Sequence, residues 1–240
     1  MLHLRLIIPT RQMTPLTEFG LCSSWRCPRC SDSTSESIGA SPVRSVSLRS
    51  MEVRTQRLGE ADAVGQVITA AFADDGQVAA LWADVVARGL DRASLVAVDG
   101  DDVVGHVGLS HGWLDARREL VDVLILSPLS VRPARQGEGI GTALVGAAID
   151  SAERLGAPSL FLEGSPAYYG QRGFQRASDN GFQAPSRRTP EPAFQVALLS
   201  GYAGWMVGRV VYRDVWWEHD KAGLRDPRLA EIERVLGGES

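Results

Sequence analysis

The sequence predicts an α/β fold in which helices flank one mixed β-sheet. Two amphipathic helical stripes precede a β-hairpin, a strand leads through a glycine-rich turn into a further helix, and two more strands follow near the end. The expected order is therefore β-α-α-β-β-β-α-β-α-β-β. That order lacks the regular strand–helix alternation of a Rossmann or barrel fold, so we expect a mixed sheet.

Composition and charge narrow the class of protein. The chain has 240 residues, of which 44% are hydrophobic and 22% are charged, so it has enough apolar material for a substantial core. Its net charge of -4 gives no reason to expect a nucleic-acid partner. No apolar run approaches the roughly 18 residues that a membrane helix needs. We therefore expect a cytoplasmic protein that binds neither nucleic acid nor membrane.

The chain changes character near residue 50. Residues 1–50 are rich in Ser, Thr and Pro and lack a sustained apolar period, whereas Met51 opens a strand-like segment. We expect 1–50 to be a disordered or non-native N-terminal extension. The globular domain is then expected over 51–219, with 220–240 as a peripheral C-terminal tail.

All three cysteines lie inside that extension. Cys22, Cys27 and Cys30 form a zinc site only if His3 supplies the fourth ligand, because a structural zinc ion is held by four ligands. The distant histidine makes this the weaker interpretation, so we expect no metal. The rest of the chain contains no thiol nucleophile.

The first half of the domain shows clear periodicity. Apolar residues fall at helical spacing over Asp62–Phe72 and again from Val78 to Gly89. Two strand-like runs then surround an Asp-Gly turn, which predicts a hairpin. The next strand, 121–131, contains Ser127-Pro128, and because proline cannot donate to a strand ladder we expect a break or bulge there.

The second half has shorter elements. We expect a helix over Thr142–Leu155, ended by Gly156 and Pro158, and then a buried strand over Ser159–Leu162. The remaining expected elements are a short helix from Pro166 to Arg172, strands over 194–199 and 205–212, and a weak helical stripe from Asp220 to Val235.

The strongest local signal is the turn Gln136-Gly137-Glu138-Gly139-Ile140-Gly141. It joins a strand to a helix, and glycines there let a ligand approach main-chain amides that a Cβ would shield. Open N–H groups and the positive end of a helix favour an anion, such as a phosphate or pyrophosphate. Taken alone, the turn is equally compatible with a purely structural role.

A second motif, the tyrosine segment after the turn, indicates a family. The pattern Gln136-x-x-Gly139-x-Gly141, followed by Tyr168-Tyr169-x-x-x-Gly173-Phe174, resembles the GCN5-related N-acetyltransferase (GNAT) family. The resemblance extends from about Met51 to Trp217. Within the family, the sequence is similar to a bacterial branch of predicted acetyltransferases. It implies a mostly antiparallel sheet whose central strands splay apart.

The resemblance also implies a reaction. Family members transfer an acetyl group from acetyl-CoA directly to an amine, without an acyl-enzyme. Tyr169 matches the family's general acid, although it is also compatible with simple packing. The residues expected at the acetyl-CoA site are Leu129, Val131, Gln136, Gly137, Gly139, Ile140, Gly141 and Thr142.

The sequence does not single out a general base. Glu163, at the end of the strand before the tyrosine pair, is the best-placed carboxylate, and His106, His111 or a water chain are alternatives. An acyl-CoA-binding sensor without turnover therefore remains an alternative to an enzyme. The acceptor is expected to be a small-molecule amine or a protein amino group, and a homodimer is common in the family.

Overall fold

The computed structural model describes residues 51–225 and 227–236. The expectations for residues 1–50, including the zinc alternative, lie outside the described residues. None of the helices in those two ranges is long and apolar enough to cross a membrane. The elements are β1 (Glu52–Thr55), α1 (Ala61–Phe72), α2 (Gln77–Ala87), β2 (Asp91–Asp99), β3 (Asp102–Ala116), β4 (Leu120–Val131), α3 (Ile140–Arg154), β5 (Ser159–Glu163), α4 (Pro166–Tyr169), β6 (Gln175–Arg176), β7 (Phe182–Gln183), β8 (Phe194–Leu198), β9 (Gly208–Val211), α5 (Asp214–Glu218) and α6 (Arg228–Leu236).

The strands form one mixed sheet in the order β1-β2-β3-β4-β5-β8-β6, and β9 pairs with β3 and β7. Only β4–β5 and β7–β9 are parallel pairs among the described strands. The mixed, mostly antiparallel sheet predicted from the sequence is confirmed. The two-residue strands β6 and β7 are too short to carry a readable period and were not predicted, and neither was the five-residue helix α5.

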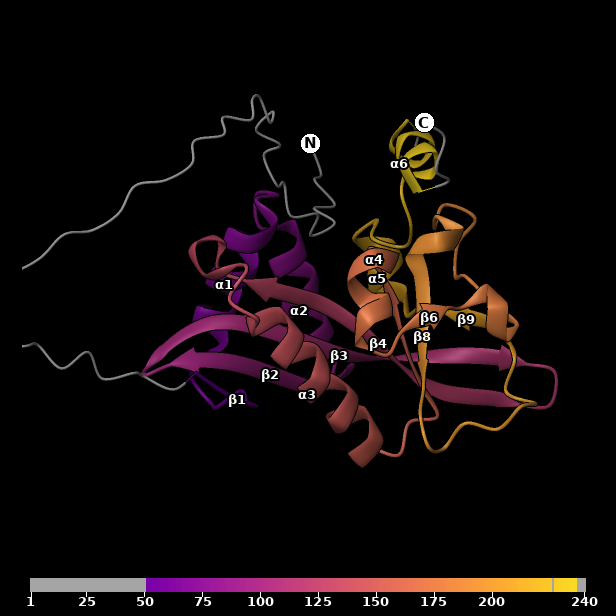
Figure 1. Cartoon of the computed structure of the whole chain (residues 1–240), viewed down its shortest axis with the longest axis horizontal. Helices are drawn as coiled ribbons and strands as arrows, with labels where there is room; N and C mark the ends of the chain where they lie inside the picture. The colour runs from indigo at the N-terminus through magenta and orange to yellow at the C-terminus, as the bar shows by residue number, and fades with distance from the viewer. Residues whose placement is uncertain (1–50, 226, 237–240) are drawn as a thin grey trace, which may run out of the picture. The chain divides into compact units, whose positions relative to one another are not determined.

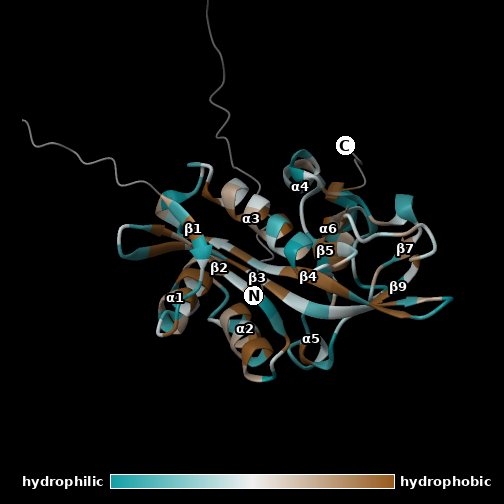
Figure 2. Cartoon of the chain, turned by 90° about the horizontal axis from the view of Figure 1, so that it is seen from below, coloured by the Kyte–Doolittle hydropathy of each residue, from teal (hydrophilic) through white to brown (hydrophobic). Residues whose placement is uncertain are grey.

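Helices cover both faces of the sheet. Figure 2 shows α3 on one side and α1 and α2 on the other, and α3 runs across the long strands in Figure 1. Alternation along β4 supplies both cores: Val123 and Ile125 pack with α1 and α2, whereas Leu124 and Leu126 pack with α3. The two hydrophobic layers hold the central strands in fixed positions.

The predicted irregularity in β4 is confirmed. Val107 pairs with Leu129 and Leu109 with Leu126, so β4 has one residue more than β3 between these pairs. The extra residue lies at Ser127-Pro128, whose peptide bond is cis. On its other side, β4 pairs with β5 only at Leu124↔Leu160 and Ile125↔Phe161. Beyond that point the two parallel strands are no longer paired.

Candidate functional site

The glycine turn has the geometry that the sequence predicts. Gly137 and Gly139 both have φ of 86°, in the left-handed region that other residues rarely adopt. Gly139 immediately precedes α3, and no side chain caps that helix. Within the described part of the chain, the amides of residues 137–142 donate to no protein acceptor. The turn therefore presents a row of open donors at the positive end of a helix.

Side chains around the turn hold it in place. The Gln136 amide Nε2 donates to the Val131 carbonyl at 3.1 Å, which ties the turn to the end of β4. Arg135 bridges Asp99 at 2.9 Å and Glu138 at 2.8 Å. Buried Ile140 packs beneath Gly105 of β3. The side chains of Gln136 and Ile140 and the Val131 carbonyl thus support the turn, which leaves its main-chain amides for a ligand.

Gly141 makes room for an aromatic residue from α4. A Cβ at Gly141 would lie 2.4 Å from the Tyr168 hydroxyl oxygen. The Arg172 guanidinium lies 3.7 Å from the centre of the Tyr168 ring and donates to the Thr142 hydroxyl at 2.8 Å. Tyr168 and Arg172 thereby connect α4 to the first turn of α3.

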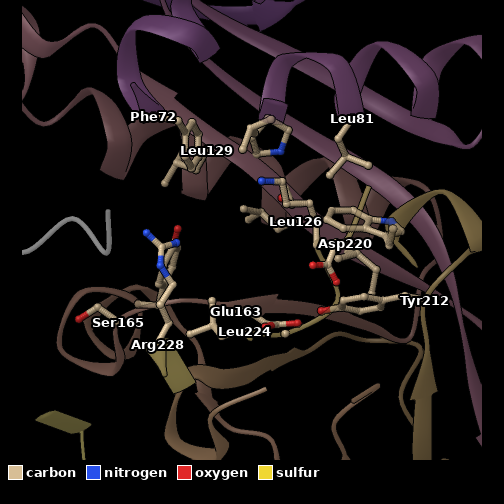
Figure 3. Close-up of a pocket in the computed structure, with 18 of the residues that line it drawn as sticks. Phe72, Leu81, Leu126, Leu129, Glu163, Ser165, Tyr212, Asp220, Leu224 and Arg228 are labelled. Carbon is tan, nitrogen blue, oxygen red and sulfur yellow. The ribbon is translucent and has the colours of Figure 1, made fainter. Parts of the chain in front are cut away.

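A cavity of about 400 Å³ opens where β4 and β5 separate. Leu126–Leu129 line it from β4, and Glu163 lines it from the end of β5 (Figure 3). Val131 is buried and is not among the lining residues. The apolar wall from α1 and α2 consists of Phe72, Val78 and Leu81.

Glu163 lies in this cavity with one oxygen buried. Among the described residues, its Oε1 atom has no hydrogen-bond partner. Burial raises the pKa of the Glu163 carboxyl to about 7, although the hydroxyls of Tyr212 and Thr189 act in the opposite direction. In Figure 3 the Glu163 carboxylate and the Tyr212 hydroxyl point toward one another. A carboxylate with this pKa can accept a proton near neutral pH.

Tyr169 also lines the cavity. Its ring packs against Gly164, where a Cβ would lie 2.3 Å from Cε2, and meets Phe174 edge-on at 5.7 Å. Burial raises the pKa of the Tyr169 phenol, so the hydroxyl stays protonated at neutral pH. The structure therefore brings a carboxylate and a protonated phenol to the same cavity.

The segment after β9 completes the wall, which the sequence did not predict. Tyr212, Trp216 and several residues of 220–228 line the cavity, and Ala222 is fully buried. This differs from the expected peripheral tail, because the chain returns to the site after α5. The sequence carries no local signal for this return, because residues 221–225 are not helical and α6 begins only at Arg228.

The two histidine alternatives lie elsewhere. His106 is fully buried, bonded through Nε2 to the Ser94 hydroxyl at 2.9 Å, and burial lowers its pKa to about 3. His111 contacts Asp122 at 2.8 Å and Arg213 at 3.0 Å. Neither histidine lines the cavity. Both belong to structural contacts of β3, so neither is in position to act as the base.

The site thus combines a row of open main-chain donors at the start of α3 with a cavity between strands that separate. Residues 65–174 match the model of the acetyltransferase (GNAT) family. The uncharacterized N-acetyltransferase YjhQ of Escherichia coli is 32% identical over 130 residues, covering 52% of this chain and 71% of the relative. The chain belongs to the GNAT family, and its enzyme class is N-acetyltransferase.

Two solved structures are similar over most of the described chain. YhbS of Escherichia coli, in complex with CoA, has a TM-score of 0.63 and 27% identity, covering 69% of this chain and 91% of that chain. A GNAT family acetyltransferase of Brucella melitensis, in complex with acetyl-CoA, has a TM-score of 0.58 and 26% identity, covering 70% and 99%.

Proposed function

We propose that this protein transfers the acetyl group of acetyl-CoA directly to an amine in a ternary complex. The observation that carries the proposal is that Glu163 and Tyr169 line one cavity at the end of the β4–β5 pairing. The similarity to solved structures holding CoA and acetyl-CoA supports the donor. Residues 51–240 contain no cysteine, which is consistent with a route that has no thioester acyl-enzyme.

Main-chain donors are expected to bind the donor molecule. The open amides of residues 137–142 suit a pyrophosphate, because oriented N–H groups at a helix start favour anions. The edge of β4 from Leu129 to Val131 is not paired with β5. Amides there are available to polarise a thioester carbonyl, and hydrogen bonds to a developing oxyanion commonly contribute more to catalysis than any other interaction. A thioester supplies an activated acetyl group to this site.

The two side chains take complementary roles. Glu163 accepts the proton that the attacking amine loses, since its pKa of about 7 leaves a large fraction ionised at neutral pH. Tyr169 holds its proton and donates it to the departing thiolate. The cavity keeps both groups beside the reacting atoms, which lowers the entropic cost of bringing them together.

Release of CoA thiol over a panel of amines tests the proposal. We expect acetyl-CoA-dependent thiol release with at least one amine, and a fall of about a hundredfold in kcat for Tyr169→Phe, as for the loss of a general acid. The matched control is Tyr202→Phe, at a tyrosine that does not line the cavity. Tight acetyl-CoA binding without thiol release for every amine would instead identify a catalytically silent acyl-CoA-binding module.

A further inference from the structure

The cavity carries more positive than negative charge on its C-terminal wall. Among the described residues, Asp220 is the one carboxylate that the segment 220–228 contributes to the lining, against three basic side chains. Asp220 is already bound by Arg225, at 2.9 Å, and by Arg188, at 3.1 Å. The other two basic side chains on this wall are Lys221, whose Nζ lies 3.8 Å from an Asp74 oxygen, and Arg228.

Lys221 is largely buried and forms one long ion pair. Its side chain is 11% exposed, and its nearest carboxylate oxygen, on Asp74, is 3.8 Å from Nζ. Nζ donates to the Gln77 Oε1 atom at 3.2 Å, which occupies one of its three N–H donors. Burial lowers the pKa of Lys221, as expected for a cation whose hydration is incompletely replaced.

Arg228 lies on the same wall. It is half-buried at the start of α6 and lines the cavity. Figure 3 shows it on the same side of the cavity as Leu224, opposite Phe72. No carboxylate of residues 51–225 or 227–236 forms an ion pair with it. Its guanidinium presents donors in a fixed planar fork, which suits a carboxylate or phosphate.

Much of the remaining lining is apolar or aromatic, with Phe72, Val78 and Leu81 from α1 and α2 and with Tyr212 and Trp216 from the segment after β9. A ligand that fills this space thus needs an apolar body, a group that meets Glu163 and a group that meets the cations. We propose that the acceptor carries an anionic group, a carboxylate or a phosphate, in addition to its amine, and that Lys221 and Arg228 bind that group. This inference rests on the proposed transfer to an amine, and it disfavours polycationic acceptors.

Matched amine pairs test it. The pairs are phenylalanine with 2-phenylethylamine, 5-aminopentanoic acid with pentylamine, and 2-aminoethyl phosphate with ethylamine, with spermidine as a polycation. We expect the anionic member of at least one pair to have a kcat/KM about tenfold higher, in line with a hydrogen bond between charged groups. The first two pairs report on a carboxylate and the third on a phosphate.

Variants connect the preference to the two residues. Arg228→Gln and Lys221→Met are each expected to reduce the anionic-to-neutral ratio of kcat/KM about tenfold. Arg234→Gln, an exposed arginine on the same helix, is the matched control and should leave the ratio as in the wild type. If Lys221→Met does not fold, Arg228→Gln still decides the result.

Several outcomes would overturn the inference. An equal or reversed preference in every pair, a preference for spermidine, or an unchanged ratio in Arg228→Gln would each do so. If Arg228→Gln lowers the affinity for acetyl-CoA but leaves the anionic-to-neutral ratio of kcat/KM unchanged, the cationic side chains bind acetyl-CoA and the inference is wrong. If no amine is acetylated, the proposed function fails separately, and calorimetric binding of the same pairs to the acetyl-CoA complex still decides whether an anionic ligand is preferred.

Discussion

Replacing Glu163 by glutamine tests whether the carboxylate at this position accepts the proton from the amine. Burial raises the pKa of this carboxyl from 4.5 to about 7. Since each tenfold difference in proton affinity is worth about 1.4 kcal/mol, the buried carboxyl is favoured in its protonated form by about 3 kcal/mol relative to the unfolded chain. Glutamine keeps the shape of the side chain but cannot accept the proton.

The sign of the stability effect follows from that rise. Between about pH 4.5 and 7 the folded protein binds more protons than the unfolded chain, so its stability falls as the pH rises. Glu163→Gln removes this penalty. The difference in unfolding free energy, variant minus wild type, should therefore increase by about 3 kcal/mol as the pH rises from 4.5 to 8. Urea denaturation across this range measures the difference.

Activity should change in the opposite direction. The wild-type kcat/KM is expected to rise as Glu163 ionises near pH 7, and Glu163→Gln should abolish that rise and lower kcat/KM about a hundredfold at pH 8. Glu119→Gln, at an exposed carboxylate, is the matched control. A variant that keeps the wild-type inflection near pH 7, or a stability difference that does not change with pH, would refute the reasoning.

Three glycines give further predictions. Gly141→Ala places a Cβ 2.4 Å from the Tyr168 hydroxyl, so it should weaken acetyl-CoA binding about tenfold, as measured by calorimetry. The double variant with Tyr168→Phe should recover acetyl-CoA affinity. An affinity that does not recover would contradict the contact. Gly108→Ala places a Cβ 2.4 Å from the Trp82 ring and should cost about 1–3 kcal/mol of unfolding free energy. Gly146→Ala, in open space within α3, should instead stabilise by about 0.5–1 kcal/mol, and equal effects at both sites would be inconsistent with this packing.

Much of the fold was predictable because long elements carry their period in the sequence. The stripes of α1 and α2 and the hairpin of β2 and β3 were found in this way, and Pro128 located the bulge in β4. The glycine turn and the tyrosine pair were recognisable because each needs particular residue types at fixed spacing. Glu163 was predicted only by its position, at the end of a strand next to the tyrosine segment.

The rest of the site could not be predicted from local sequence patterns. Tyr212 and Trp216 reach the cavity because β9 pairs with β3 and the chain then returns through α5. Such a long-range pairing leaves no period in the sequence. For the same reason, the sequence could not show that His106 lies beneath Trp82 in the core rather than at the cavity.

The most direct test of direct transfer is the initial-rate pattern of CoA release, with acetyl-CoA varied at several fixed concentrations of an accepted amine. A ternary complex predicts double-reciprocal lines that intersect, together with an acetylated amine nitrogen in the product and no acetylated protein by intact mass. Parallel lines with an acetylated protein would contradict the account, because they would require a covalent acyl-enzyme.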